Sequence, residues 1–336
     1  MKSGFVAILG RPNVGKSTLL NALIGEKVSI VTAKPQTTRS RITGVLEVPP
    51  ARKGKQDAKA AAQIVFVDTP GVHKPASQLD RRMLQEVHEA LESRDLVLVL
   101  VDATRRVKLK EDRSPVSESR PGAPGGSEDD LLFSLVRHLD CPVFLVLTKI
   151  DLVQKDQLLP LIESLTNHYN FAQVIPVSAL KRDGLDVLLR KIVEVLPKGE
   201  RYFPKDQYTD QPVRFMVAEL IRESILIETG EEVPYASAVV IEEFDEPESS
   251  PKTHRKAHIA AAIYCERDGQ KAILIGKGGS KLKAIGTGAR RKIESLLGVP
   301  VYLELHVIVE PGWRESRAFV ESLDWRKQLD RLAGEK

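Results

Sequence analysis

The chain has 336 residues, of which 42% are hydrophobic and 29% charged, and its formal net charge is +4 at pH 7. This length predicts two domains that each bury a core, and the composition excludes a chain that is disordered throughout. A net charge this small does not by itself indicate a nucleic-acid partner, so the positions of the charges must decide.

The two cysteines, Cys141 and Cys265, lie far apart, and neither belongs to a C-x-x-C pair. They therefore predict neither a disulfide framework nor a zinc site, and a reducing compartment fits best. The apolar run near the N-terminus is too short for a signal-peptide core, and the longest apolar run, 96–101, has the length of a strand. We expect a cytoplasmic protein.

From Phe5 to about Leu196, short β-branched runs alternate with amphipathic helical patterns. This alternation predicts an α/β domain with a mixed, mostly parallel sheet and helices on both faces, the architecture of nucleotide-binding domains. The run 41–48 alternates more strictly and predicts an edge strand antiparallel to the next run. The runs are 5–9, 41–48, 64–68, 96–102, 143–148 and 174–178.

A polar, proline-marked segment at 194–212 precedes a change of pattern. The sequence then predicts a small α+β domain. We set the boundaries at 1–197 for the nucleotide-binding domain, 198–212 for a linker and 213–336 for the second domain. Its expected elements are a helix at 213–229, strands at 235–244 and 258–266, a glycine loop, a helix at 280–297 and a strand at 301–309.

Three polar stretches, 49–62, 111–130 and 245–258, read as insertions beside the predicted strands. The middle one is dense in proline, glycine and serine. We expect flexible surface loops there and assign no chemistry to them.

The stretch GRPNVGKS, from Gly10 to Ser17, satisfies G-x-x-x-x-G-K-[ST] between a predicted strand and a predicted helix. Glycines let the backbone curl so that its N–H groups face phosphates, helped by the positive end of the following helix. Lys16 is expected to reach the β- and γ-phosphates and Ser17 to ligate Mg²⁺. A chance glycine turn is the alternative, which the flanking elements disfavour. The neighbouring residues expected to contact the nucleotide are Asn13, Val14, Gly15 and Thr18.

Two later motifs decide which nucleotide the loop binds. Asp68 and Gly71, in DTPG, follow a strand and are placed to hold Mg²⁺ through water and to approach the γ-phosphate. In TKID, the Asp151 carboxylate can accept both donors of guanine, N1–H and N2–H₂, a pair that adenine lacks. Each motif alone is weak evidence, but the ordered set at strand ends predicts GTP and GDP as ligands. The remaining contacts expected for the base come from Thr148, Lys149, Ser178 and Ala179.

A second glycine loop, GKGG at Gly276 to Gly279, does not fit the first pattern, because Gly278 stands where Ser or Thr follows the lysine. It fits the G-x-x-G of a KH domain, which presses on a nucleic-acid backbone and takes about four unpaired nucleotides. Basic residues surround it with no acid before Glu294, although a merely solvated face is the alternative. The residues expected to bind RNA are Gly276, Lys277, Gly278, Gly279, Lys281, Lys283 and Arg290, with Arg291 and Lys292 nearby.

The helix after this loop carries apolar residues at three- and four-residue spacing, from Leu282 to Leu296, which predicts a core face rather than a base-reading one. Ile273 and Ile275 precede the loop and either line the groove or belong to the core. We favour the core for both.

With these motifs in order, the chain resembles the bacterial Era-type GTPases. The segments KPQTTRSRITG (34–44), DTPGVHKP and LIGKGGSKLKAIGTGARRKIESLLG carry the resemblance, which covers nearly the whole chain apart from the three insertions. It implies a GTP-hydrolysing switch with a type II KH domain that binds the single-stranded 3′ region of small-subunit ribosomal RNA and assists small-subunit assembly. It also implies Thr38 as the switch threonine on Mg²⁺, with Thr37 as the alternative, and a catalytic set of Lys16, Thr38 and Gly71. Peripheral contact with the inner face of the cell membrane is implied too, without an amphipathic segment to indicate it, and we expect a monomer.

Three positions bear on catalysis and affinity. Thr148 stands where the guanine motif usually begins with Asn, so we expect it to keep a hydrogen-bonding oxygen but to lose the amide that braces the P-loop. Asp151 is expected to keep the preference for GTP, with weaker affinity. Val72 follows Gly71 where Ras-like proteins have a water-orienting glutamine, so slow hydrolysis is expected, with water held by backbone, switch or cation. Asn13 either holds a monovalent cation such as K⁺ or braces the loop.

Two other readings remain open. One is a GTPase of another process, such as tRNA modification or a membrane-linked process, whose second domain is a different interaction module. The other is a metabolic P-loop enzyme such as a kinase, which would leave TKID unexplained.

Overall fold

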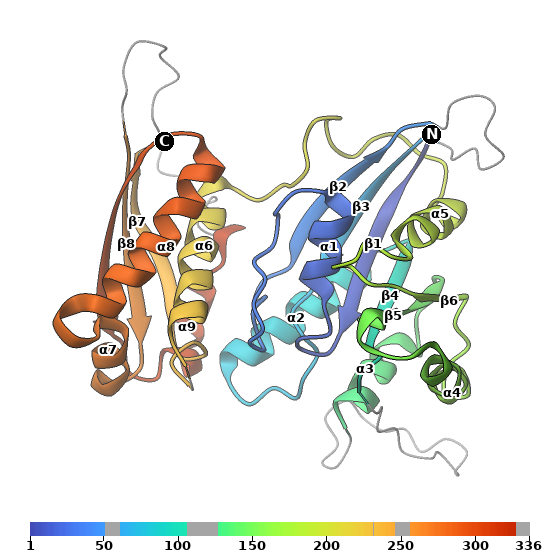
Figure 1. The fold of residues 1–336 in the computed structure, drawn as a ribbon, viewed down its shortest axis with the longest axis horizontal. Coiled ribbons are helices and arrows are strands. Elements are labelled where there is room, and N and C mark those ends of the chain that lie inside the picture. The colour runs from blue at the N-terminus through green and yellow to red at the C-terminus, as the bar shows by residue number, and fades with distance from the viewer. Residues whose placement is uncertain (51–60, 106–126, 231, 246–255, 327–336) are drawn as a thin grey trace. The chain divides into compact units, whose positions relative to one another are not determined.

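The structure, a computed structural model, describes residues 1–50, 61–105, 127–230, 232–245 and 256–326. Its residues fall into two compact units (Figure 1). The first comprises 1–29, 38–76 and 80–210, and the second comprises 30–37, 77–79 and 211–336. Each unit is described by itself.

The first unit contains a six-stranded sheet in the order β2-β3-β1-β4-β5-β6. All neighbouring pairs are parallel except β2 with β3, which lies at the edge and is antiparallel. The predicted mixed, mostly parallel sheet and its antiparallel edge strand are confirmed. The strands are β1 (Lys2–Gly10), β2 (Ile42–Val48), β3 (Ala62–Asp68), β4 (Leu96–Asp102), β5 (Val143–Thr148) and β6 (Gln173–Pro176).

Helices cover both faces of this sheet because its central strands are mostly apolar and are buried on both sides. Side chains of α2, α3 and α4 form one buried cluster with β1, β4 and β5, while α1 and α5 lie on the other face (Figure 1). The parallel strands direct their carboxyl ends to one edge, where the loops after β1, β3, β5 and β6 meet. The helices are α1 (Lys16–Ile24), α2 (Gln78–Glu92), α3 (Glu128–Val136), the 3₁₀ turn η1 (Ile150–Leu152), α4 (Lys155–Thr166) and α5 (Leu185–Val195).

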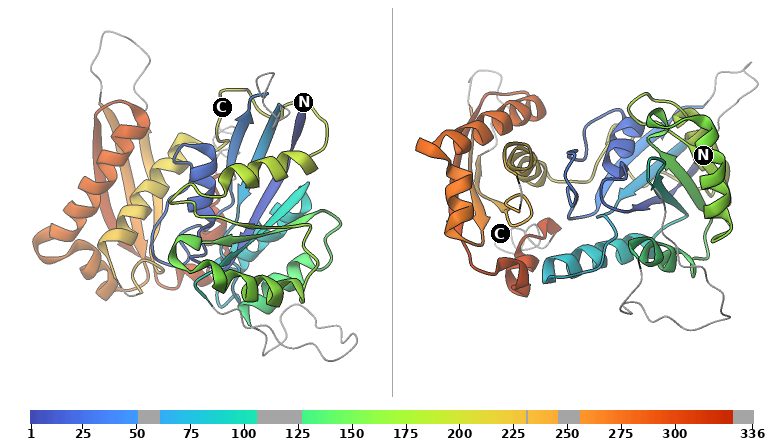
Figure 2. Two further views of the ribbon diagram at one scale, coloured as in Figure 1. Left: turned by 45° about the vertical axis from the view of Figure 1, so that its right-hand side comes forward. Right: turned by 60° about the horizontal axis from the view of Figure 1, so that its bottom comes forward.

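The second unit has a three-stranded sheet in the order β7-β8-β9, with β7 antiparallel and β9 parallel to β8. Buried side chains of α6, α7 and α8 pack on this sheet, and Figure 2 shows the unit from two further sides. This is the small α+β domain that the sequence predicts. Its elements are α6 (Val213–Glu228), β7 (Ala238–Asp245), β8 (Ala257–Cys265), α7 (Asp268–Ile275), η2 (Lys277–Gly279), α8 (Ser280–Leu297), β9 (Val301–Val309), η3 (Trp313–Glu315) and α9 (Arg317–Ser322).

The three predicted surface loops are shorter than expected where the structure describes them. In the stretch 111–130, Ser127 caps α3: its hydroxyl accepts from the Asp130 N–H at 3.0 Å, and the Asp130 carboxylate accepts from the Ser127 N–H at 2.6 Å. The S-x-x-D capping box explains why a helix begins inside a polar stretch. Ala62, at the end of 49–62, and both ends of 245–258 lie in strands. Of the three predicted loops, residues 51–60, 111–126 and 246–255 lie outside the described residues.

Candidate functional site

The first glycine loop joins β1 to α1 at the carboxyl edge of the large sheet. Asn13 and Gly15 both have positive φ, 61° and 100°, which turns the backbone back toward the start of α1. Gly15 is the N-cap of that helix, so no side chain there covers the first N–H groups. A Cβ at Gly15 would meet nothing within 4 Å, so the conformation rather than crowding favours glycine. The loop presents open backbone donors at the positive end of a helix.

Lys16 and Asp68 form a buried pair of opposite charges beneath this loop. The Lys16 ammonium donates to the carbonyls of Gly10 and Arg11, at 3.1 and 3.0 Å. Burial lowers the pKa of Lys16 to about 8, against the opposing effect of Asp68. Burial likewise raises the pKa of Asp68 to about 6, although the Lys16 charge and nearby hydroxyls act the other way. An added anion would therefore stabilise the charged form of Lys16, and an added cation would stabilise the charged form of Asp68.

Three hydroxyls lie around Asp68, those of Ser17, Ser29 and Thr38, and Ser29 Oγ donates to Asp68 Oδ2 at 3.4 Å. Ser17 Oγ donates to Asp68 Oδ2 at 2.6 Å and lies 2.9 Å from Thr38 Oγ1. Asp68 Oδ1 is buried and has no hydrogen-bond partner among the described residues. Hydroxyl and carboxylate oxygens with one unsatisfied acceptor are the ligands that Mg²⁺ prefers, so the residues fit that ion. Thr37, the alternative switch threonine, instead donates to the Lys34 carbonyl at 2.7 Å.

Gly71 lies directly against the first glycine loop. A Cβ there would come within 2.8 Å of the Pro12 backbone nitrogen and Cα, so no larger residue fits without displacing backbone. The next residue, Val72, donates its N–H to the Gly10 carbonyl at 3.0 Å and buries its side chain, which is 1% exposed. Val72 therefore ties the two loops together and directs no side-chain group into the site.

Thr148 braces the glycine loop through its hydroxyl. Its Oγ1 donates to the Val14 carbonyl at 2.7 Å, and the side chain is buried at the end of β5. The sequence predicts that threonine keeps a hydrogen-bonding oxygen here and loses the asparagine amide. In the structure this oxygen itself supplies the brace, because the hydroxyl at the end of β5 reaches the Val14 carbonyl.

The other guanine-motif residues gather at the same edge. Lys149, at a φ of 60°, donates its ammonium to the Asn13 carbonyl at 2.9 Å, and the exposed Asp151 follows it in η1. After β6, the Ser178 N–H donates to the Asp183 carbonyl at 3.0 Å and Ser178 Oγ accepts from Lys181 N–H at 3.1 Å. Ala179 comes next, half-buried. The structure thus brings together the first glycine loop, the TKID segment (148–151) and the pair Ser178 and Ala179.

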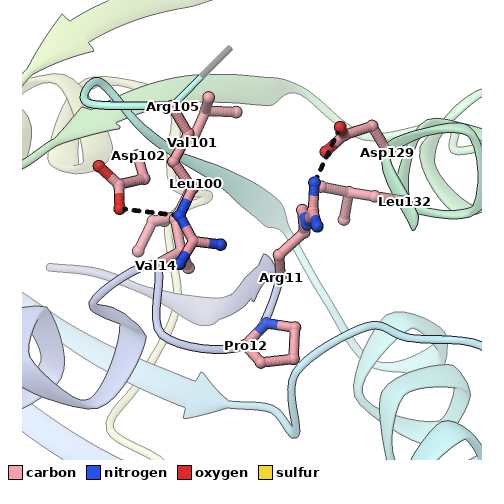
Figure 3. Close-up of a pocket in the computed structure, with 9 residues that line it drawn as sticks. All are labelled: Arg11, Pro12, Val14, Leu100, Val101, Asp102, Arg105, Asp129 and Leu132. Atoms are coloured by element: carbon pink, nitrogen blue, oxygen red, sulfur yellow. Dashed lines mark hydrogen bonds and ion pairs between the residues drawn. The ribbon is translucent and has the colours of Figure 1, made fainter. Parts of the chain in front are cut away.

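Two residues that the sequence reasoning passed over also border this loop. Arg11 forms ion pairs with Glu128 and Asp129 at the start of α3, at 2.5 and 3.1 Å. Asp102 ends β4 on the other side of a pocket beside the loop, where it faces Arg105 (Figure 3). An aspartate at the end of a buried strand, next to three motif-bearing strands, was the available signal for Asp102.

The second glycine loop connects α7 to α8 in the second unit. Gly276, Gly278 and Gly279 all have positive φ, at 71°, 59° and 79°. A Cβ at Gly276 would lie 2.9 Å from the Lys281 backbone nitrogen, whereas Gly278 and Gly279 face open space. The loop is therefore tight at its first glycine and accessible at its last two.

Basic side chains lie in this loop and along the helix α8 that follows it. Lys277, Lys283, Arg290 and Arg291 are exposed and Lys281 is half-buried, whereas Lys292 is ion-paired with Glu223 at 2.8 Å. The predicted core face of α8 is confirmed, since Ile285, Ala289 and Ile293 are buried and Leu282 and Leu296 pack against them.

The two isoleucines before the loop differ in their surroundings. Ile273 is 50% exposed, so the expectation that it belongs to the core is wrong. Ile275 packs against the core as expected. Helix periodicity separates them, because residues two apart on a helix point in different directions.

The fold and the two loops define a P-loop GTPase domain joined to a KH domain. Comparison with family models agrees: residues 5–149 match the model described as 50S ribosome-binding GTPase, and residues 232–314 match a KH domain.

Relatives match over almost the full length. GTPase Era of Lacticaseibacillus paracasei is 45% identical over 323 residues, covering 96% of each chain. GTPase Era of Ruminiclostridium cellulolyticum is 39% identical over 325 residues, covering 97% of this chain and 98% of the relative. The chain therefore belongs to the Era family of GTPases.

Solved structures give the same assignment. A point variant of Aquifex aeolicus Era, bound to GDP.AlF4-, matches with a TM-score of 0.82 and 38% identity, over 97% of this chain and 99% of that one. A structure of Era in complex with MgGDPNP and nucleotides 1506–1542 of 16S ribosomal RNA matches to the same extent.

Proposed function

We propose that this GTPase binds single-stranded small-subunit ribosomal RNA through its KH domain and assists assembly of the small ribosomal subunit. The observation that carries the proposal is the 38% identity, over 97% of the chain, to an Era that was solved with MgGDPNP and a segment of 16S ribosomal RNA. The domain limits that we propose remain 1–197 for the GTP-binding domain and 213–336 for the RNA-binding domain.

In the nucleotide site we assign the phosphates to the loop N–H groups and to Lys16. Lys16 would exchange the carbonyls of Gly10 and Arg11 for the β- and γ-phosphates, whose charge also relieves the cost of burying an ammonium. Mg²⁺ would be held by Ser17, Thr38 and Asp68, and would supply neutralisation of the phosphate charge. The wedged position of Gly71 against Pro12 supports its backbone N–H as the group that meets the γ-phosphate.

For the base, we propose that the Asp151 carboxylate accepts from N1–H and N2–H₂ of guanine. The N–H of Ser178 donates to Asp183, so we assign the contact with O6 to the N–H of Ala179. The Lys149 stem would cover one face of the base. An Asp151→Asn variant is expected to lose its preference for GTP over inosine triphosphate, which lacks the 2-amino group.

We propose that the attacking water is positioned by backbone groups, by the switch segment or by a bound cation. The Val72 side chain cannot do this, because it is buried and has no polar group. We propose that Asn13, held at a φ of 61° in the loop, ligates a monovalent cation such as K⁺. Hydrolysis rates measured in K⁺ and in Na⁺ test this. A higher rate in K⁺ supports the cation, and equal rates leave Asn13 as a brace of the loop.

For RNA, we propose that the accessible end of the second loop, Gly278 and Gly279, presses on the backbone while the surrounding lysines and arginines neutralise phosphates. Replacing both glycines by aspartate should abolish binding of the 3′ segment of small-subunit RNA. Gly298→Asp is a matched control, because Gly298 also has a positive φ, 69°, and open space around it, but lies at the far end of α8. Equal loss in the control would assign the effect to backbone strain.

The cellular proposal is tested by crosslinking and sequencing bound RNA in the presence of GTP and of GDP. Enrichment of the 3′ region of small-subunit RNA supports it. Enrichment of large-subunit RNA or tRNA would contradict it and favour a GTPase of another process. We also propose a monomer in the cytoplasm, with peripheral attachment at the inner membrane face as the alternative. Separating the same preparations by size, and into soluble and membrane fractions, tests both proposals. No helix in the described part of the chain is long and apolar enough to cross a membrane.

A further inference from the structure

Asp102 is a buried carboxylate for which the proposed function gives no role. It ends β4, beside β5, and its side chain is 6% exposed. Its two carboxylate oxygens have different hydrogen-bond partners. Oδ1 accepts from the N–H and the hydroxyl of Thr104, at 3.0 and 2.7 Å, and Oδ2 accepts from the Lys149 ammonium at 2.7 Å.

Lys149 is thereby held at two points. Its ammonium donates to the Asn13 carbonyl at 2.9 Å as well as to Asp102, so the side chain spans from the end of β5 to the glycine loop. Four rotatable bonds separate this ammonium from the backbone, and a lysine free to move would lose that freedom only when a base packs against it. Fixing the ammonium in advance fixes the course of the stem.

The pairing with Lys149 is stronger than the other ionic contact of Asp102. The Arg105 guanidinium lies 3.8 Å from Oδ2, and its side chain is 55% exposed, so solvent weakens that contact (Figure 3). Burial alone would raise the pKa of Asp102, but the hydrogen bonds from Lys149 and Thr104 and the Lys149 charge outweigh it and hold the pKa below its usual value. The carboxylate is therefore charged at neutral pH and available to the lysine.

We propose that Asp102 is a positioning residue for guanine recognition, which anchors the Lys149 ammonium so that its stem forms a preformed platform for the base. This inference rests on the proposed assignment of Lys149 to the base. Asp102 influences nucleotide affinity through Lys149, whereas its hydrogen bonds with Thr104 hold the turn after β4.

The experiment is a double-mutant cycle on the full chain, with binding of fluorescent GDP as the readout. Asp102→Asn keeps the size of the side chain and its hydrogen bonding to Thr104 but removes the charge that holds the lysine. Lys149→Met keeps an apolar stem without the ammonium. We expect Asp102→Asn to weaken GDP binding by about tenfold, and by less than about twofold when Lys149→Met is already present. Thr104→Val is the matched control and should bind GDP as the wild type does.

Equal losses from Asp102→Asn in both backgrounds, or no loss in the wild-type background, overturn the inference, because Asp102 would then act without Lys149. If Lys149→Met binds GDP normally, the proposed assignment of Lys149 to the base fails, and the inference fails with it. Where a single variant does not fold, Asp102→Glu takes its place. It keeps the carboxylate and displaces it by one methylene, so several-fold weaker binding is expected and unchanged binding overturns the inference.

Discussion

Replacing Thr148 with valine removes the hydroxyl that holds the glycine loop while leaving the shape of the side chain nearly unchanged. The Thr148 hydroxyl has one hydrogen, and of the two carbonyls it approaches, Val14 at 2.7 Å and Val101 at 3.3 Å, the closer one receives the stronger bond. Valine would leave the Val14 carbonyl without this donor in a place where both residues are buried.

A buried acceptor that loses its donor costs about 1–3 kcal/mol. Because the bond joins two buried residues of the protein itself, its loss should lower the free energy of unfolding, which is measured on nucleotide-free protein. A loop held less firmly should also release GDP faster, by a factor smaller than the roughly 5- to 150-fold that the whole cost would give.

Urea unfolding of the nucleotide-free protein and the rate of GDP release measure the two effects. Thr148→Ser is the matched control, since it keeps the hydroxyl and loses only the methyl group, and it should retain most of the stability and nearly the wild-type release rate. A free energy of unfolding of Thr148→Val within about 0.3 kcal/mol of the wild type would refute the reasoning, because the brace would then carry no weight.

Three further outcomes are expected. Gly71→Ala should weaken GTP binding by about tenfold in calorimetry, because its Cβ would come within 2.8 Å of the Pro12 backbone. The pKa of Asp68, raised to about 6, means that the folded protein holds this proton more tightly than the unfolded chain, so its contribution to stability is present at low pH and is lost as pH rises from about 4 to 6. Urea unfolding without Mg²⁺ and nucleotide should show this fall, by up to about 3 kcal/mol, and Asp68→Asn should lack it. Ile273→Ser should weaken RNA binding in a filter assay without lowering the melting temperature, because Ile273 is half exposed.

The strands β4 and β5 were predictable because their side chains are apolar up to the last residue. The runs 96–102 and 143–148 coincide with β4 and β5, and α8 has the predicted bounds of 280–297. Such runs have few alternatives once a motif marks where each must end, and the helix carries both a clear periodicity and glycines at its ends. Local pattern and tertiary structure agree at these places.

What sequence reasoning missed depends on contacts between distant segments. Asp102 and Lys149 are 47 residues apart, and Arg11 and Asp129 are 118 apart, so no local spacing joins them. For a related reason the sequence predicts a hydrogen-bonding oxygen at Thr148 but not the carbonyl that it reaches. Its effect depends on how closely the end of β5 approaches Val14, which is a distance that the residue type does not specify. The start of α3, by contrast, had a local signal in its capping box and was readable.

Both glycine loops leave the N–H groups at the start of a helix open to a phosphate, but their neighbouring elements differ. Each places a glycine with positive φ, Gly15 or Gly279, at the N-cap of a helix whose first turn contains no acid. Both helices therefore offer uncovered N–H groups and lysine to a phosphate. The first loop lies at the edge of a parallel sheet, where Asp68 and two hydroxyls can add a metal ion to the same phosphates. The second follows a helix, α7, rather than a strand, and the basic side chains of the loop and of α8 are what it adds. The geometry of the neighbours, and not the glycines, therefore decides between a nucleotide with its metal and a polynucleotide backbone.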